Sequence, residues 1–326
     1  MRNVTLCALQ TADLGCDPKF YSLSENFERN PETILKEHVM PRLELNAELI
    51  ARCAGSGARI ALTTENVCGM YPFMLADRPF VDVITQRSGD LADEFFSALA
   101  KKHQLHIAAC YNKRIGGKNY NVTSIFAPNG QLAGEYRKTH LPPDEMWHLE
   151  DGDELNVIEL DFGKVGVLIC YDIMFPEAAS ALALQGAEII LHPTAGYGWY
   201  DAIGEATLRT RANDNSVYIL TAKNYVYNGA GKSSIIDPWG HALADAGFYK
   251  NVTVHREIDL DERKVQADWH TPSQMSGIAD VRKRYLQERR PALYGKLTEP
   301  AARLRTPGEA EREVLRERIR KGECHW

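Results

Sequence analysis

Three residues whose side chains could perform covalent chemistry each follow an apolar segment typical of a buried strand. They are Glu65 after residues 58–63, Lys138 after residues 131–136 and Cys170 after residues 164–169. In sheets with helical crossovers, active sites collect at the carboxyl ends of strands, so we expect these three side chains to lie close together. Each residue alone is more often ordinary, as a core cysteine, a loop glutamate or a surface lysine. The three together indicate a catalytic site.

A thiol, a carboxylate and an ammonium group can together cleave a carbon–nitrogen bond. A thiolate attacks an acyl carbon, but a free thiol has a pKa of about 8.5 and needs a base or a nearby cation. Glu65 can accept the proton of Cys170 and later pass it to the departing amine. Lys138 and the backbone N–H of Tyr171 can stabilise the oxyanion of the tetrahedral intermediate. The expected products are an acid and ammonia or an amine, formed through a thioester on Cys170.

The composition excludes several classes of protein. The chain has 326 residues, of which 44% are hydrophobic, and a net charge of −6 at pH 7, so a nucleic-acid partner is not expected. No apolar run approaches the ~20 residues of a membrane span, and the N-terminus enters a strand pattern at once. Seven cysteines without paired spacing favour a reducing cytoplasm over a disulfide framework. Metal-binding spacings of Cys and His are absent, so we expect no metal and no other cofactor.

The elements that must position these residues follow from hydrophobic periodicity and turn signals. Helices are expected from Pro31 to Ala54 with a kink at Pro41, from Gly89 to His103, and over 176–185 and 200–213. Strands and helices alternate at both ends of this region, with antiparallel hairpins between them, which predicts an α/β sandwich of mixed sheets covered by helices. The expected strands are 3–10, 58–63, 105–111, 118–127, 131–136, 157–161, 164–169, 188–192, 216–222, 233–236 and 252–258.

The composition changes after Asp259, which divides the chain into two parts. We expect a catalytic domain over residues 1–265 and a C-terminal extension over residues 266–326 that packs on the domain or on a partner subunit. Within the extension, Glu309–Lys321 is a run of Glu and Arg at helical spacing. This pattern is typical of a solvated terminal helix, and the alternative is an arm that contacts a second subunit.

Three motifs in this order resemble the nitrilase, or carbon–nitrogen hydrolase, superfamily, and the resemblance covers roughly residues 3–260. It implies a four-layer α-β-β-α sandwich that commonly forms homodimers or larger homo-oligomers. The motifs are Thr-Thr-Glu ending at Glu65, Tyr-Arg-Lys-Thr-His-Leu-Pro around Lys138, and Cys-Tyr-Asp-Ile-Met-Phe-Pro-Glu starting at Cys170. Later segments around His192, Arg209 and Asp237 also resemble the family.

The resemblance further implies a second glutamate downstream of the lysine. The best match is Glu145, which would orient the substrate or water and share the charge of Lys138. Glu150 is a nearby alternative, because the spacing of this glutamate varies in the family.

The residues after Cys170 bear on the substrate. Nitrilases of the family usually follow the cysteine with Trp-Glu, so Tyr171 and Asp172 depart from that pattern. Omega-amidases usually carry an arginine where this chain has Met174. A thioether cannot pair with a carboxylate, which favours a neutral or partly apolar amide; ordinary core packing is the alternative role for Met174. The candidate substrate-binding residues are Tyr71, Tyr171, Met174 and Thr194.

The sequence therefore predicts a cytoplasmic, homo-oligomeric hydrolase that cleaves a small linear, non-peptide amide. The alternative is an N-carbamoyl-amide hydrolase of the ureidopropionase or carbamoylase type, and a nitrilase is a weaker one. A non-catalytic binding homologue would be expected to lose Glu65, Lys138 or Cys170, and this chain retains all three.

Overall fold

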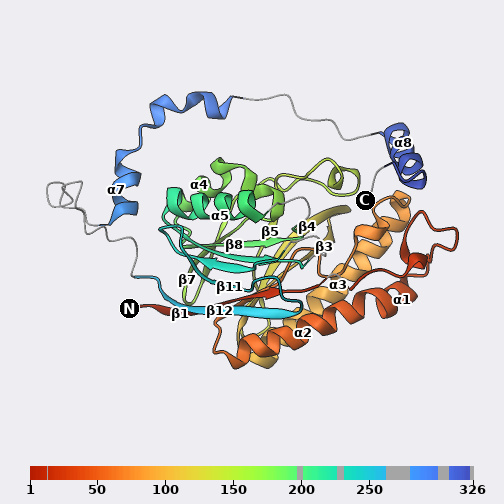
Figure 1. The fold of residues 1–326 in the computed structure, drawn as a ribbon, viewed down its shortest axis with the longest axis horizontal. Coiled ribbons are helices and arrows are strands. Elements are labelled where there is room, and N and C mark those ends of the chain that lie inside the picture. The colour runs from red at the N-terminus through yellow and green to blue at the C-terminus, as the bar shows by residue number, and fades with distance from the viewer. Residues whose placement is uncertain (13, 197–200, 226–230, 262–279, 300–307, 324–326) are drawn as a thin grey trace.

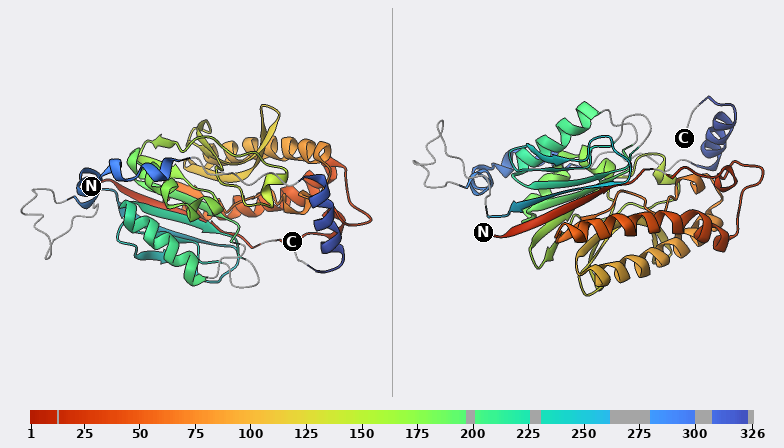
Figure 2. Two further views of the ribbon diagram at one scale, coloured as in Figure 1. Left: turned by 90° about the horizontal axis from the view of Figure 1, so that it is seen from above. Right: turned by 60° about the horizontal axis from the view of Figure 1, so that its bottom comes forward.

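Two six-stranded mixed sheets pack face to face, and helices cover the outer face of each sheet (Figure 1). The computed structural model describes residues 1–12, 14–196, 201–225, 231–261, 280–299 and 308–323. The two further views show the same order of layers, from helices through both sheets to helices (Figure 2). The predicted four-layer α/β sandwich is confirmed.

The first sheet has the strand order β12-β1-β2-β3-β4-β5, in which β1, β2 and β3 are parallel and the other pairs are antiparallel. Helices α2 (Met40–Gly55) and α3 (Arg78–His103) cover its outer face. Its strands are β1 (Asn3–Gln10), β2 (Ile60–Leu62), β3 (His106–Ile115), β4 (Lys118–Phe126), β5 (Leu132–Arg137) and β12 (Val252–Asp259).

The second sheet has the order β11-β10-β9-β8-β7-β6, with β7, β8 and β9 parallel. Helices α4 (Pro176–Leu184) and α5 (Asp201–Asn215) cover its outer face. Its strands are β6 (Val157–Leu160), β7 (Gly163–Val167), β8 (Ile189–Thr194), β9 (Tyr218–Lys223), β10 (Ser234–Ile236) and β11 (Ala242–Asp245).

Side-chain alternation along β1 shows how one strand serves two cores. Cys7 and Leu9 point to the helices α2 and α3, whereas Leu6 and Ala8 point to the second sheet. Successive side chains of a strand face opposite sides, so a strand buried on both faces is apolar at nearly every position. This double burial explains the continuous apolar segments that mark the strands in the sequence.

The start of α3 differs from the sequence-based expectation. The helix begins at Arg78, well before the predicted start at Gly89, and the Asp77 carboxylate caps it by accepting a hydrogen bond from the backbone N–H of Phe80 at 3.2 Å. Gly89 lies inside the helix, where a Cβ would come within 3.1 Å of the Asn112 carbonyl oxygen on β3. The glycine at this position therefore permits close packing between the helix and the strand, and it does not mark a helix boundary.

Other boundaries need smaller corrections. The helix after Asn30 starts as α1 (Pro31–Ile34) and passes through a π-helical turn (Leu35–Val39) into α2, so its irregularity precedes Pro41. Strand β11 is absent from the expected strands, and it pairs antiparallel with β10. Tyr200, the predicted first residue of α5, and the predicted domain boundary at 265/266 lie outside the described residues.

The C-terminal part contributes α7 (Val281–Glu288), two short 3₁₀ turns (Pro291–Leu293 and Gly295–Thr298) and α8 (Glu309–Arg320). Helices α7 and α8 lie at opposite ends of the molecule in every view (Figures 1 and 2). None of the helices in the described ranges is long and apolar enough to cross a membrane.

The core between the sheets should dominate stability. Leu6 is fully buried there, whereas Leu132 on the edge strand β5 is 50% exposed. We expect Leu6→Ala to lower the free energy of unfolding by about 2–5 kcal/mol, because it removes apolar contacts and leaves a cavity. Leu132→Ala should change it by no more than about 0.5 kcal/mol. Urea denaturation of both variants tests this expectation, and equal losses would contradict the placement of the core.

Candidate active site

The predicted residues Glu65, Lys138 and Cys170 meet at one end of the two sheets, after strands β2, β5 and β7. The Lys138 ammonium is fully buried and donates to Glu65 Oε1 at 2.9 Å. It also donates to both carboxylate oxygens of Glu145, at 2.7 and 2.9 Å. The alternative residue, Glu150, has a side chain that is 42% exposed and lies 3.8 Å from Arg78, outside this cluster.

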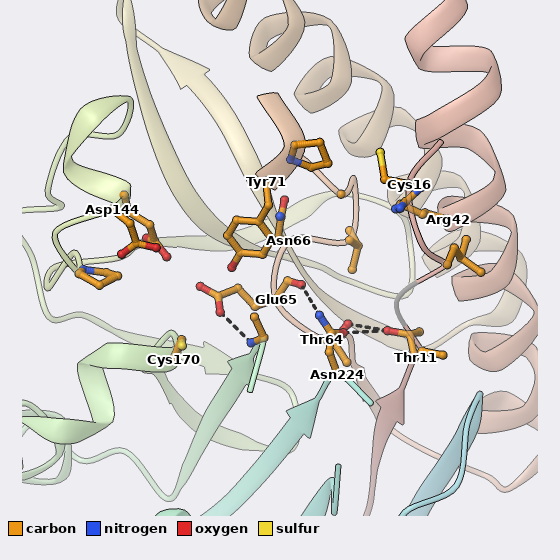
Figure 3. Close-up of a pocket in the computed structure, with 18 of the residues that line it drawn as sticks. Thr11, Cys16, Arg42, Thr64, Glu65, Asn66, Tyr71, Asp144, Cys170 and Asn224 are labelled. Carbon is orange, nitrogen blue, oxygen red and sulfur yellow. Dashed lines mark hydrogen bonds between the residues drawn. The ribbon is translucent and has the colours of Figure 1, made fainter. Parts of the chain in front are cut away.

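The Glu65 carboxylate is held at both oxygens. Oε1 accepts a hydrogen bond from the Asn121 side-chain amide at 2.8 Å, in addition to the Lys138 ammonium. Oε2 accepts one from the backbone N–H of Ala195 at 2.8 Å, the contact drawn in Figure 3. A carboxylate with these fixed partners has one orientation, which a proton acceptor needs.

Cys170 stands on a sharp turn. Strand β7 ends at Val167, and Cys170 opens a 3₁₀ turn (Cys170–Met174) with a φ of +48°. A residue other than glycine in this left-handed region is held there by its surroundings. Cys170 lines the cavity and also packs against the core between the two sheets.

Asp172 ties the turn of Cys170 to the segment that carries Lys138. Its buried carboxylate accepts hydrogen bonds from the backbone N–H of Ile169 at 2.8 Å and from that of His140 at 2.9 Å. The Tyr136 hydroxyl donates to it at 2.9 Å. One carboxylate thus fixes the spacing between the strand ends of β5 and β7.

His192 anchors the backbone carbonyl of Cys170 through a hydrogen bond. Burial lowers the pKa of His192 to about 4, so the ring is neutral at neutral pH. Its Nε2 lies 3.3 Å from the Cys170 carbonyl oxygen and its Nδ1 lies 2.9 Å from the Thr221 hydroxyl. With Nε2–H as donor, Nδ1 accepts from Thr221. Because the peptide is planar, anchoring the Cys170 carbonyl also fixes the direction of the Tyr171 N–H.

The electrostatics of the cluster follow from burial and from neighbouring charges. Burial alone disfavours the charged form of Lys138, but Glu145 and Glu65 outweigh it and hold the pKa of Lys138 well above its ordinary value. Burial, supported by the Glu65 charge and opposed by Lys138, raises the pKa of Glu145 to about 7. Burial and then Glu65 raise the pKa of the Cys170 thiol, while Lys138 and a hydrogen bond with Thr194 act against them. The thiol therefore needs a base to lose its proton.

A cavity of about 830 Å³ lies over these residues. In Figure 3, Cys170 lies at one side, Glu65 and Tyr71 lie in the middle, and Cys16 and Arg42 lie at the other side. Apolar lining residues come from segments that are distant in the chain and that no local sequence pattern connects. They include Leu14, Leu45, Val67, Pro72, Pro142, Pro143, Trp147 and Leu315.

The four predicted substrate-binding residues have different positions. Tyr71 and Tyr171 line the cavity. Thr194 is buried, and its side chain makes a hydrogen bond with the Cys170 thiol. Met174, at the end of the 3₁₀ turn, is 42% exposed and is not among the residues that line the cavity. The specificity argument built on Met174 therefore has no support from this placement.

Within the ranges that the structure describes, no group of three or more His, Cys, Asp or Glu side chains is placed to hold a metal ion. The cluster at the cavity floor instead pairs its two glutamates with an ammonium group.

The chain is similar in sequence to hydrolases and in fold to a solved amidase. Omega-amidase NIT2 from Homo sapiens is 33% identical over 227 residues, which cover 65% of this chain and 80% of that protein. A protein of Pseudomonas protegens described as "Hydrolase in pqqF 5' region" is 37% identical over 210 residues, 62% of this chain and 68% of its own length. An amidase from Nesterenkonia sp. has a similar fold, with a TM-score of 0.66, 20% identity, and coverage of 90% of this chain and 96% of its own.

The family model for carbon–nitrogen hydrolases matches residues 32–267, a range that contains Glu65, Lys138, Glu145 and Cys170. With most of its length inside this match, the chain belongs to the carbon–nitrogen hydrolase family, part of the nitrilase superfamily.

Proposed function

We propose that the protein is an amidase that hydrolyses a linear, non-peptide amide through a thioester on Cys170. The observation that carries the proposal is the buried Lys138 ammonium, paired with Glu65 and Glu145 beneath a cavity that contains Cys170. Omega-amidases among the relatives support amides as the substrate class.

In the first half of the reaction, Glu65 takes the proton of Cys170 and the thiolate attacks the amide carbon. A C–S bond forms, and the carbonyl oxygen becomes an oxyanion that faces Lys138 and the Tyr171 N–H. The intermediate then collapses, the C–N bond breaks, and Glu65 gives its proton to the departing nitrogen. The products of this half are ammonia or an amine and the Cys170 thioester.

In the second half, a water molecule loses its proton to Glu65 and attacks the thioester carbon. The new C–O bond forms, the C–S bond breaks, and the proton returns from Glu65 to the Cys170 sulfur. Glu145 contributes by holding the Lys138 ammonium at both of its oxygens and by facing the cavity. It thereby keeps the positive charge close to the oxyanion.

The cellular location and the oligomeric state of the protein are also proposals. All cysteines in the described ranges are free thiols, which supports a reducing cytoplasm as the location. Exposed apolar side chains support a homo-oligomer: Leu184 on α4 and Ile203 on α5 are 42% and 66% exposed, and Leu293 and Leu297 in the C-terminal part are each 64% exposed.

The role of Cys170 can be separated from that of another cysteine in the same cavity. Cys170→Ala should abolish turnover while the protein stays folded, because it removes the sulfur that forms the acyl intermediate. Cys16→Ala is the matched control, since Cys16 also lines the cavity but lies away from Glu65 and Cys170 in Figure 3. Ammonia release from a panel of amides, N-carbamoyl compounds and nitriles measures both variants.

Full activity of Cys170→Ala would refute the thioester mechanism. Turnover of carbamoyl compounds alone would replace the amidase proposal with the carbamoylase alternative.

Glu65→Gln and Lys138→Ala should each lower kcat by about 100-fold or more, because they act at the chemical step. A change in KM alone would assign these two residues to binding.

The acid limb of the pH profile should report the titration of Glu145. Burial raises the pKa of Glu145 to about 7, so this carboxylate takes up a proton in the folded protein as the pH falls through 7. A protonated Glu145 no longer pairs with the Lys138 ammonium as an anion, so kcat/KM should fall below about pH 7. Glu145→Gln removes the titrating group, so the activity that remains should show no acid limb near pH 7. An acid limb at the same pH in this variant would contradict the assignment to Glu145.

The proposed assembly predicts at least a dimer by light scattering at micromolar concentration. Truncation before Pro291 should weaken it, because it removes the exposed side chains of Leu293 and Leu297. Truncation before Gly308 is the control, since it keeps those two leucines and removes α8 with the residues on either side of it. A monomeric wild-type protein, or equal assembly of both truncated forms, would exclude this part of the proposal.

A further inference from the structure

Helix α8 has one face turned to the rest of the chain. Arg312, Leu315, Arg316 and Ile319 are partly buried, and their spacing places them on one side of a helix. Val314, on the other side, is 62% exposed. A fully solvated helix, which the charged pattern favours, would not show this asymmetry.

Two arginines hold this helix against the loops at the edge of the cavity. Arg312 donates to the backbone carbonyl of Trp147, and its guanidinium carbon lies 5.8 Å from the centroid of the Trp147 ring. Arg316 donates twice to the carbonyl of Leu75, at 3.2 and 3.0 Å. Hydrogen bonds from a charged donor are about twice as strong as neutral ones, so these contacts fix where α8 lies.

Both contacts are close to the residues proposed to act in the reaction. Trp147 ends the 3₁₀ turn Glu145–Trp147, which carries Glu145, and its side chain lines the cavity. Leu75 follows the segment that holds Tyr71, which lines the same cavity. Helix α8 therefore bridges the two loops at the cavity edge.

Leu315 lies between the two arginines on this inner face and lines the cavity itself. Helix α8 begins at Glu309, beyond residues 32–267 that match the family model, so this wall is supplied by a part of the chain outside that match. The cavity has a volume of about 830 Å³, within the range of roughly 300–1,000 Å³ that encloses drug-sized ligands. A short-chain amide such as acetamide or butyramide leaves most of it empty.

We propose that α8 is the outer wall of an acyl-binding pocket and that Leu315 is a specificity-determining residue for amides with long apolar acyl groups. The inference rests on the proposed amidase function and adds the acyl class to it. An extended hydrocarbon chain gains affinity from each methylene that it buries against an apolar wall. Leu315 provides such a wall, together with Trp147 and the prolines Pro142 and Pro143.

The test compares acetamide, butyramide and octanamide on the full-length enzyme. Leu315→Ala should lower kcat/KM for octanamide by about tenfold, mainly through KM, and leave acetamide unchanged. Val314→Ala is the matched control on the exposed face and should change neither substrate. A wild-type preference for acetamide, or an equal loss on both substrates in Leu315→Ala, would overturn the proposal.

The arginine contacts that hold α8 against the two loops give a second measurement. Arg312→Ala combined with Arg316→Ala should release α8 from the two loops and reproduce the selective loss of kcat/KM for octanamide. Arg318→Ala is its control, because that side chain is 54% exposed and its ion pair, with Glu323 at 3.9 Å, lies at the C-terminal end of the helix itself. An unchanged ratio of octanamide to acetamide turnover in the double variant would exclude α8 as a wall.

A binding measurement separates this inference from the proposed reaction. Calorimetric titration of Cys170→Ala protein with octanamide needs no turnover. Adding Leu315→Ala should weaken that binding by about tenfold, whereas adding Val314→Ala should not. If the wild-type enzyme hydrolyses no amide while this binding difference is present, the proposed amidase reaction is refuted and the role of α8 as a pocket wall is supported. If amides are hydrolysed and the binding difference is absent, the role of α8 as a pocket wall is refuted.

Discussion

The rest of the site depends on one buried charge, the ammonium group of Lys138. A fully buried ammonium is costly unless it is paired and hydrogen-bonded. Glu65 and Glu145 supply that pairing, but two carboxylates around one cation leave an excess negative charge in a buried place. Burial first, and then the neighbouring negative charge, raises the pKa of Glu145 to about 7 and raises the pKa of the Cys170 thiol. The cluster is thus ready to accept a proton, which is the first requirement for activating a thiol.

This cluster needs strand ends from both sheets at fixed spacing. Glu65 and Lys138 follow strands of the first sheet, whereas Cys170 follows a strand of the second. Asp172 connects the Cys170 turn to the segment after β5, and His192 anchors the carbonyl of Cys170 from β8. A sandwich with a tightly packed core between its sheets can hold such distances, because a packed core does not deform continuously.

The sequence predicts the sandwich and the convergence of the strand-end residues because both follow from local patterns. Burial on both faces leaves continuous apolar segments, and a parallel strand brings the residue after it to a common edge. The position of Met174 could not be predicted in this way, since strand β7 ends at Val167 and Met174 lies in a 3₁₀ turn, where strand alternation does not apply. The early start of α3 escapes prediction for a related reason: Gly89 serves a contact with β3 that no local pattern reveals.

Helix α8 shows why charge patterns are a weak guide to exposure. Its inner face contains two arginines, which sequence patterns assign to solvent, yet an arginine can bury its stem while its guanidinium donates to backbone carbonyls. Loop carbonyls at a cavity edge are acceptors left over by irregular backbone, and Leu75 and Trp147 provide them here. The same contacts that satisfy these carbonyls place Leu315 in the cavity. Helix α8 therefore borders the cavity and contacts the turn that carries Glu145.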